Sequence, residues 1–295
     1  MIQELLYPGL YLHNMTDNIL AHLQKASLTK KEFNKFLYLP RKAFTDSAKK
    51  RFSKFDTNLD FTHPDFKKRI EINKKLASLI SINHFINYPG IKILELGASF
   101  GAISSLSVII HLLENGYQGK ISLTLLDISL EPLKRTKAID FNLKGLMKHL
   151  KAIDHLEKVT QITKNSQIIK DSFINPSLKV LGSRFDIVIS AFTQHHLNLN
   201  NKIRACKIME SIIQARGLIL LGDLTFNYGQ YIKWLKKHSN EKNSKGEEIP
   251  YAIESFITFN KHLKMFSNSI KINAVQGDIY YCAAFKSSHP KSIPK

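Results

Sequence analysis

The chain has 295 residues, 43% of them hydrophobic, and these numbers suit one large or two modest globular domains. Because no apolar run approaches the roughly 20 residues of a membrane helix, and the N-terminus lacks a basic start, we expect no membrane span and no signal peptide. The two cysteines, Cys206 and Cys282, argue against a disulfide framework and predict buried core thiols in a cytoplasmic protein. The net charge of +19 indicates either a solvated lysine-rich surface or a basic patch for RNA or another anion.

The N-terminal region, residues 1–84, is predicted to form a helical cap. Residues 29–32 have the spacing of a capping box, and residues 40–55 form a basic segment with phenylalanine anchors. A further helix begins at Pro64, because proline is well tolerated at the first helical position. The residues that then share one face at helical spacing are Phe66, Ile70, Ala77 and Ile80.

After Gly90 the pattern changes to short apolar runs that alternate with longer helical stretches. The predicted strands are 91–97, 121–127, 185–192 and 217–223, with one more in either 161–166 or 166–171, and two near the C-terminus at 269–275 and 278–286. The predicted helices are 102–114, 130–151 and 200–215. Repeated strand–helix–strand order predicts an α/β protein with a parallel sheet and helices on both of its faces.

Residues 224–269 interrupt this alternation and are predicted to be an insertion. Its aromatic residues are Phe226, Tyr228, Tyr231, Trp234 and Tyr251. They would either line a substrate site as part of a lid or pack two helices onto the sheet. The last residues, 288–295, are polar and contain prolines, and we expect them to be disordered.

The stretch ILELGASFGAIS, residues 93–104, ends the first predicted strand in a glycine turn. Ligands of open α/β sheets bind at the carboxyl ends of the strands, where Gly97 permits a tight turn and Gly101 a close approach to the backbone. The spacing departs from the dinucleotide fingerprint G-x-G-x-x-G, which disfavours a nicotinamide-dependent dehydrogenase. Glu95, at the strand end, suits an ammonium or N–H donor better than a pyrophosphate.

Residues 95–101, ELGASFG, resemble the first motif of class I S-adenosylmethionine-dependent methyltransferases, E/D-x-G-x-G-x-G, with Ser99 at the middle glycine. Residues 185–197, FDIVISAFTQHHL, resemble the fourth-strand region in the small-molecule branch of that family. The resemblance spans about residues 91–286. It implies a Rossmann-like, seven-stranded methyltransferase sheet with an antiparallel last strand, a methyltransferase domain at 85–287, and the N-terminal helices as an extension.

The resemblance also implies S-adenosylmethionine as the cofactor. Glu95 would bind the methionyl ammonium, Asp127 both ribose hydroxyls, Ile128 the adenine face, and Asp171 the adenine amine. From the residues alone, Asp127 could instead cap the next helix, and Asp171 could be a simple turn acid. The complete predicted cofactor set is Glu95, Gly97, Ala98, Ser99, Gly101, Asp127, Ile128, Asp171, Ser172, Ala191 and Phe192.

Two histidines, His195 and His196, follow the fourth predicted strand. Either could accept a proton during methyl transfer, and at least one is expected to pack and orient the loop. No metal site is predicted, because adjacent loop histidines rarely reach one ion and no ligand cluster accompanies them. The predicted function is methyl transfer to O, N or C of a small organic molecule, mainly by positioning. The alternatives are an RNA or protein acceptor, supported by the charge, and a non-catalytic scaffold, which intact Glu95 and Asp127 disfavour.

Overall fold

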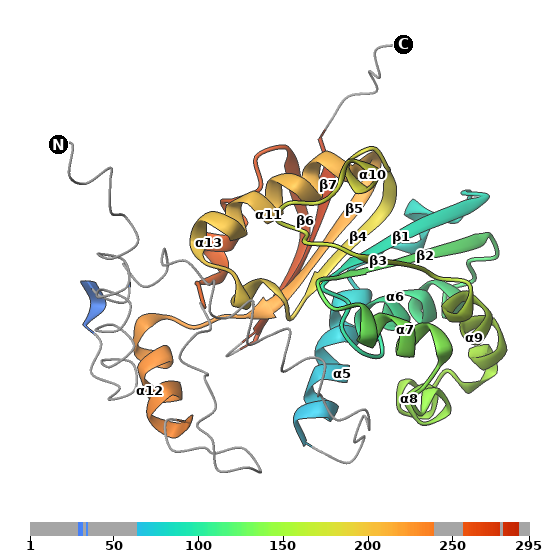
Figure 1. Cartoon of the computed structure of the whole chain (residues 1–295), viewed down its shortest axis with the longest axis horizontal. Coiled ribbons are helices and arrows are strands. Elements are labelled where there is room, and N and C mark those ends of the chain that lie inside the picture. The colour runs from blue at the N-terminus through green and yellow to red at the C-terminus, as the bar shows by residue number, and fades with distance from the viewer. Residues whose placement is uncertain (1–28, 32–33, 35–63, 239–255, 278–279, 289–295) are drawn as a thin grey trace.

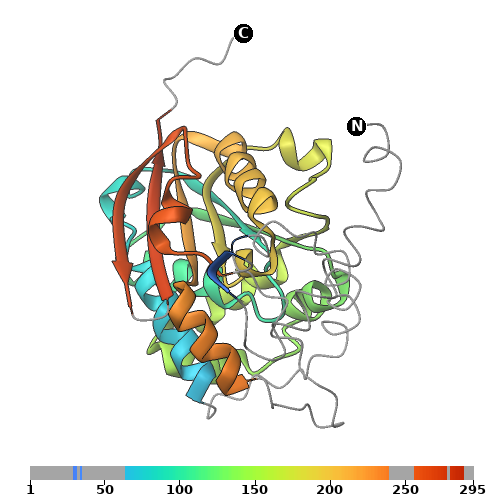
Figure 2. The same ribbon diagram turned by 90° about the vertical axis from the view of Figure 1, so that its left-hand side faces the viewer.

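Seven strands form one mixed sheet in the computed structural model, which describes residues 29–31, 34, 64–238, 256–277 and 280–288. The strands are β1 (Gly90–Leu96), β2 (Lys120–Asp127), β3 (Gln167–Lys170), β4 (Phe185–Ala191), β5 (Ile213–Leu224), β6 (Ser269–Gln276) and β7 (Tyr280–Ser287). Their order is β3-β2-β1-β4-β5-β7-β6. The first five strands run parallel, and β7 pairs antiparallel with both β5 and β6, at the edge seen in Figure 2.

Helices cover both faces of the sheet (Figure 1). They are α5 (Pro64–Ala77), α6 (Ile103–Glu114), α7 (Leu130–Ala138), α8 (Leu143–Leu150), α9 (Leu156–Lys164), α10 (Leu178–Leu181), α11 (Leu199–Ile212), α12 (Tyr228–His238) and α13 (Phe259–Leu263). Single 3₁₀ turns are η1 (Ile82–His84), η2 (Ile153–His155) and η3 (Gln194–His196). No helix in the described part of the chain is both long and apolar enough to cross a membrane.

Each strand divides its side chains between two hydrophobic cores, because successive residues point to opposite faces. In β1, Ile91 and Ile93 pack with α5 to α9, whereas Leu94 and Leu96 pack with α10, α11 and α13. All four side chains are fully buried. This double burial explains why the strands are continuous apolar runs in the sequence rather than alternating ones.

The predicted Rossmann-like methyltransferase sheet with its antiparallel last strand is confirmed, and the differences are local. The expected helix 130–151 is two helices, because the chain turns at Ile139 with φ 58° and Asn142 caps α8 by accepting from Gly145 N. The expected helix 200–215 ends at Ile212, where the chain becomes extended and joins β5. The third strand lies in the second of the two expected positions.

The helix predicted at Pro64 is α5, and it packs against α6, β5 and β7. Its predicted face is buried at Ile70 and Ala77, and Ile80 just beyond the helix is buried as well. Residues 40–55, most of the first 63 residues and residues 289–295 lie outside the described part of the chain. The predicted domain limits, 1–84, 85–287 and the insertion 224–269, remain predictions.

Candidate active site

The strand order reverses between β1 and β4, so the loops that follow these two strands flank a topological switch point. The two loops touch there. Thr193, after β4, bonds through its hydroxyl to Ala191 O at 2.9 Å and reaches Gly97 O at 3.4 Å. A Cβ on Gly97 would lie well inside van der Waals contact with the Thr193 side chain. Glycine is therefore required at this position both by space and by its φ of 72°.

The glycine turn after β1 holds an unusual backbone path. Gly97, Ser99, Gly101 and Ala102 all have positive φ, and for Ser99 the value is 52°. The amides of Gly97 and Ala98 donate to Leu126 O, and Gly101 N donates to the Thr136 hydroxyl at 2.8 Å. Ser99 thus adopts the left-handed conformation that a glycine adopts without strain, at the position where the motif has one.

Glu95 lies in β1, two residues before Gly97, and is 2% exposed. Its carboxylate accepts from Ser105 N at 3.0 Å and from the Ser105 hydroxyl. Because the N-cap of α6 is Ala102, which has no capping side chain, Glu95 supplies an acceptor for the first turn of that helix. Burial raises the pKa of Glu95 to about 7, against the lowering effect of these hydrogen bonds.

Asp127 ends β2, the neighbour of β1, and is 8% exposed. Its two oxygens accept from Ser99 N at 3.0 Å and Ser129 N at 2.9 Å. Burial raises the pKa of Asp127, and these bonds oppose the rise. Its negative charge also contributes to the raised pKa of Glu95. The structure therefore brings the two predicted carboxylates together beside one glycine turn, on the α6 side of the sheet.

Asp171 follows β3, and its amide donates to Asp127 O at 2.9 Å, so it adjoins the same site. Its carboxylate accepts from Ser172 N and Ser177 N, both at 2.7 Å. Burial alone would raise the pKa of Asp171, but the bonds from Ser177 and Ser172 lower it. These contacts fit the turn-acid interpretation. Ile128 and Ser172 are half-buried at the same edge.

On the other side of the switch point, Ala191 ends β4 and Phe192 follows it. Ala191 is buried, and Phe192 has φ 53°, which is strained for a bulky side chain. The Phe192 amide donates to Gly222 O at 2.8 Å, which anchors this conformation to β5. The guanidinium of Arg69, on α5, lies 5.6 Å from the centre of the Phe192 ring.

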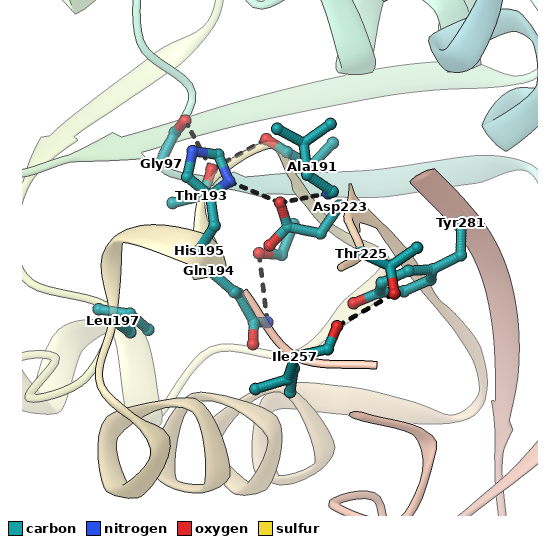
Figure 3. A network of polar contacts seen from close by, with 12 residues as sticks. Gly97, Ala191, Thr193, Gln194, His195, Leu197, Asp223, Thr225, Ile257 and Tyr281 are labelled. Carbon is teal, nitrogen blue, oxygen red and sulfur yellow. Dashed lines mark hydrogen bonds and ion pairs between the residues drawn. The ribbon is translucent and has the colours of Figure 1, made fainter. Parts of the chain in front are cut away.

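The turn η3 carries the two predicted histidines and Gln194, and the side chains of His195 and Gln194 point in different directions (Figure 3). His195 points to the end of β5, where its Nδ1 lies 2.6 Å from the Asp223 carboxylate. Gln194 points away from His195 and is fully buried. The rings of His195 and His196 are 4.0 Å apart. Among the described residues, no three His, Cys, Asp or Glu side chains gather as metal ligands would.

The aromatic residues of the segment after β5 pack on the His195 side of the sheet. Phe256 stacks on His195 with ring centres 5.7 Å apart, and Phe226 and Tyr231 pack on Phe256. All three aromatic side chains are buried. This packing fits the interpretation that aromatics attach helices to the sheet. The side chains of Trp234 and Tyr251 lie outside the described set.

Sequence reasoning missed several polar residues around the turn. Lys202, Asp223 and His262 are buried there, as is Tyr281. Only Asp223 could have been found from the sequence, because it is an acidic residue at the end of a buried apolar strand, as Asp127 is. The other three carry no local signal, because they come from two helices and a strand that only the fold brings together.

No protein-family model matches this chain, and no curated protein matches it in sequence. Among solved structures, the PH0226 protein of Pyrococcus horikoshii OT3 is similar with TM-score 0.52 and 15% identity, over 80% of this chain and 97% of that one. The N-methyltransferase NodS of Bradyrhizobium japonicum WM9, in complex with S-adenosyl-L-homocysteine, gives TM-score 0.46 and 13% identity over 78% and 91%. The magnesium protoporphyrin IX methyltransferase ChlM of Synechocystis PCC 6803, with bound S-adenosyl-L-homocysteine, gives 0.47 and 13% over 75% and 84%.

The chain has the fold of the class I S-adenosylmethionine-dependent methyltransferases. The strand order, the antiparallel β7 and the glycine turn after β1 define it.

Proposed function

We propose that the chain is an S-adenosylmethionine-dependent methyltransferase that acts on O, N or C of a small organic molecule. One observation carries the proposal: Glu95 and Asp127 lie on the same face of the neighbouring strands β1 and β2, and Asp127 accepts a hydrogen bond from the glycine turn after β1. Two acids and a tight backbone turn suit a ligand with an ammonium at one end and a diol at the other.

The donor set fits such a ligand. A carboxylate offers about four acceptor positions, and the two oxygens of Asp127 accept from the amides of Ser99 and Ser129. The remaining positions could accept from two ribose hydroxyls. Gly97, with no Cβ, lets the turn pack closely against Thr193. Glu95 would then bind the methionyl ammonium. Ile128, Asp171 and Phe192 would line the rest of the site.

The bound cofactor supplies an electrophilic methyl group on a good leaving group, so the chain itself has mainly to align the acceptor atom. The turn after β4 faces the glycine turn through the contact of Thr193 with Gly97. His195 and His196 on that turn are proposed to contact the acceptor, and His195 to receive its proton.

The proposal is tested by calorimetric titration of S-adenosylmethionine into the intact chain and into Asp127→Ala. We expect at least a tenfold loss of affinity, because the variant lacks the carboxylate that is proposed to accept hydrogen bonds from both ribose hydroxyls. Asp186→Ala is the matched control, since Asp186 is a half-buried strand aspartate that accepts from Lys92 N at the opposite end of the sheet. Equal affinity of the wild type and Asp127→Ala would refute the assignment.

An RNA or protein acceptor is the second candidate, and the net charge of +19 favours it. Binding of a structured RNA that weakens steeply between 50 and 200 mM salt, on the order of 100-fold or more, would support this candidate. Binding that is weak and similar at both salt concentrations would support the small-molecule acceptor.

A reducing compartment such as the cytoplasm is proposed as the location. Cys206 and Cys282 are both buried and unpaired, and burial raises the pKa of the Cys206 thiol well above its usual value. Such thiols behave as core residues, which supports the proposal.

A further inference from the structure

A buried polar cluster lies behind the turn Gln194–Leu197, on the face of the sheet opposite Glu95. Its side chains come from five elements and are Gln194, His195, Lys202, Asp223, His262 and Tyr281. Burying this many polar groups is costly unless each group is hydrogen-bonded or charge-compensated. The contacts within the cluster therefore indicate what it does.

Asp223 fixes the tautomer of His195. Its Oδ1 lies 2.6 Å from His195 Nδ1 and also accepts from Leu224 N at 2.8 Å. Burial alone would raise the pKa of Asp223, but His195 and Lys202 lower it below its usual value, so the carboxylate is ionised. An ionised carboxylate can only accept a hydrogen bond. In the neutral imidazole, the proton therefore sits on Nδ1, and Nε2 carries the lone pair.

Lys202 holds the turn from the other side and supplies the compensating charge. It is 1% exposed, and its ammonium donates to the carbonyls of Gln194 and of Leu197, the latter at 2.7 Å. These two carbonyls bracket His195 in the chain. With Asp223 negative and Lys202 positive, the cluster is neutral while His195 is neutral. A proton gained by His195 then lies beside the Asp223 carboxylate.

A chain of hydrogen bonds fixes Gln194, the residue before His195. The Tyr281 hydroxyl donates to His262 Nδ1, and His262 Nε2 donates to Gln194 Oε1 at 2.8 Å. Burial lowers the pKa of His262 to about 3, so this ring is neutral at pH 7 and suited to one donor and one acceptor role. The turn is thus anchored to α11, α13 and β7 as well as to β5.

We propose that Asp223 and Lys202 are positioning residues that hold His195 as a proton acceptor with Nε2 as the basic nitrogen. This inference rests on the proposed methyltransferase function and narrows it to acceptors with a removable proton, such as a hydroxyl or an N–H group. As the acceptor atom bonds to the methyl carbon, the carbon–sulfur bond breaks and its electron pair goes to sulfur. The acceptor's proton moves to Nε2, and the positive charge passes from the sulfonium to the imidazolium, where Asp223 stabilises it.

The charges around His195 make the proposal testable. Asp223 from β5 bonds to His195 Nδ1, and His196 in η3 lies against its ring. Lys202 from α11 and His262 from α13 bond to the adjacent Gln194 and act electrostatically on Asp223. Of these, Asp223 favours the protonated imidazole and Lys202 disfavours it. Removing each charge should therefore move the pKa of His195 in opposite directions.

The experiment is a pH titration of long-range ¹H–¹⁵N spectra of the intact chain, which report both the tautomer and the pKa of each imidazole. The signal of His195, one of 12 histidines, is assigned by its absence from His195→Gln. We expect the Nδ1–H tautomer in the wild type. We expect the pKa of His195 to fall by about one unit or more in Asp223→Asn and to rise by about half a unit or more in Lys202→Met. Asp186→Asn and Lys207→Met, distant or exposed matched controls, should shift it by less than about 0.2 unit.

An Nε2–H tautomer in the wild type overturns the inference, as does a shift of the same sign in both variants or no shift in either. If Lys202→Met does not fold alone, the double variant Asp223→Asn with Lys202→Met restores charge balance, and we expect it to melt at a higher temperature than Lys202→Met. No recovery in the double variant counts against the pairing of these two charges. Calorimetry with S-adenosylmethionine is independent of these spectra, so a chain that shows the expected tautomer but binds no cofactor would refute the proposed function alone.

Discussion

The loops on the two sides of the switch point are each held in place by a different kind of hydrogen bond. At the ends of β1 and β2, backbone amides close to each other in the fold bond to Glu95 and Asp127, and glycines set the path. At the ends of β4 and β5, side chains from distant segments hold the turn, as in the bond between Gln194 and His262, 68 residues apart. A ligand site built from backbone leaves a motif in the sequence, and a site built from long-range side chains does not.

The two sides also use opposite faces of the sheet. Glu95 shares its face with Ile91 and Ile93, whereas Asp223 shares its face with Ile219 and Leu221. Variants on one face should therefore change cofactor affinity, and variants on the other should change stability or the state of His195. The following predictions test this separation.

Gly97→Ala is expected to have the largest effect, because Gly97 lies where the two sides touch. The added methyl group overlaps the Thr193 side chain, and alanine is strained at φ 72°. We expect a loss of about 4 kcal/mol in unfolding free energy and no measurable binding of S-adenosylmethionine. Denaturant unfolding and calorimetry measure the two effects.

Gly116→Ala is the matched control for the Gly97 variant. Gly116 has φ 88°, but a Cβ there would meet no atom within 4 Å. We expect it to lose only the backbone component, about 1 kcal/mol, with cofactor affinity unchanged. Equal losses in the two variants would mean that contact between the two loops contributes nothing.

Glu95→Gln is expected to separate stability from binding on the cofactor side. The pKa of Glu95 is raised from 4.5 to about 7, so the folded state retains a proton that the unfolded state releases between these values. Wild-type stability is therefore lost as pH rises from about 4.5 through 7, and the neutral variant avoids this loss. We expect the variant to be up to about 3 kcal/mol more stable at pH 8 and equal to the wild type at pH 4.

The same variant should bind S-adenosylmethionine about tenfold more weakly if the proposed function holds, because it removes the charge that is proposed to bind the ammonium. Thermal unfolding across the pH range and calorimetry at pH 8 measure both quantities. A variant that gains stability but keeps full affinity would leave Glu95 as a cap of α6 only.

Tyr281→Phe tests the other face with a smaller change. It leaves buried His262 Nδ1 without its donor, which should cost about 1–2 kcal/mol. Affinity for S-adenosylmethionine should stay within twofold of the wild type. Tyr117→Phe, which removes a partly buried bond to Tyr88 O, is the matched control and should cost less. A tenfold loss of cofactor affinity in Tyr281→Phe would mean that the two faces are coupled.

Ser99→Gly should have the smallest effect. A glycine adopts the φ of 52° without the strain that Ser99 carries, so we expect a gain of about 0.5 kcal/mol and unchanged affinity. A loss of stability would show that the serine side chain makes a contact worth more than the strain.

The fold could be predicted because each strand leaves a local apolar run, and Gly97, Glu95 and Asp127 lie where such runs end. The sequence could not predict the break at Ile139 or the early end of α11. Both depend on tertiary packing, which overrides helical periodicity. Lys202 reads in the sequence as one more surface lysine. Only the fold shows it buried, with its ammonium on two carbonyls of the turn before its helix.

A crystal structure of the intact chain with S-adenosyl-L-homocysteine tests the central proposal most directly. We expect the ribose hydroxyls within hydrogen-bond distance of Asp127 and the amino acid end at the glycine turn above Glu95. The sulfur atom should face the turn that carries His195. A ligand bound elsewhere, or bound here with neither carboxylate in contact, would contradict the proposal.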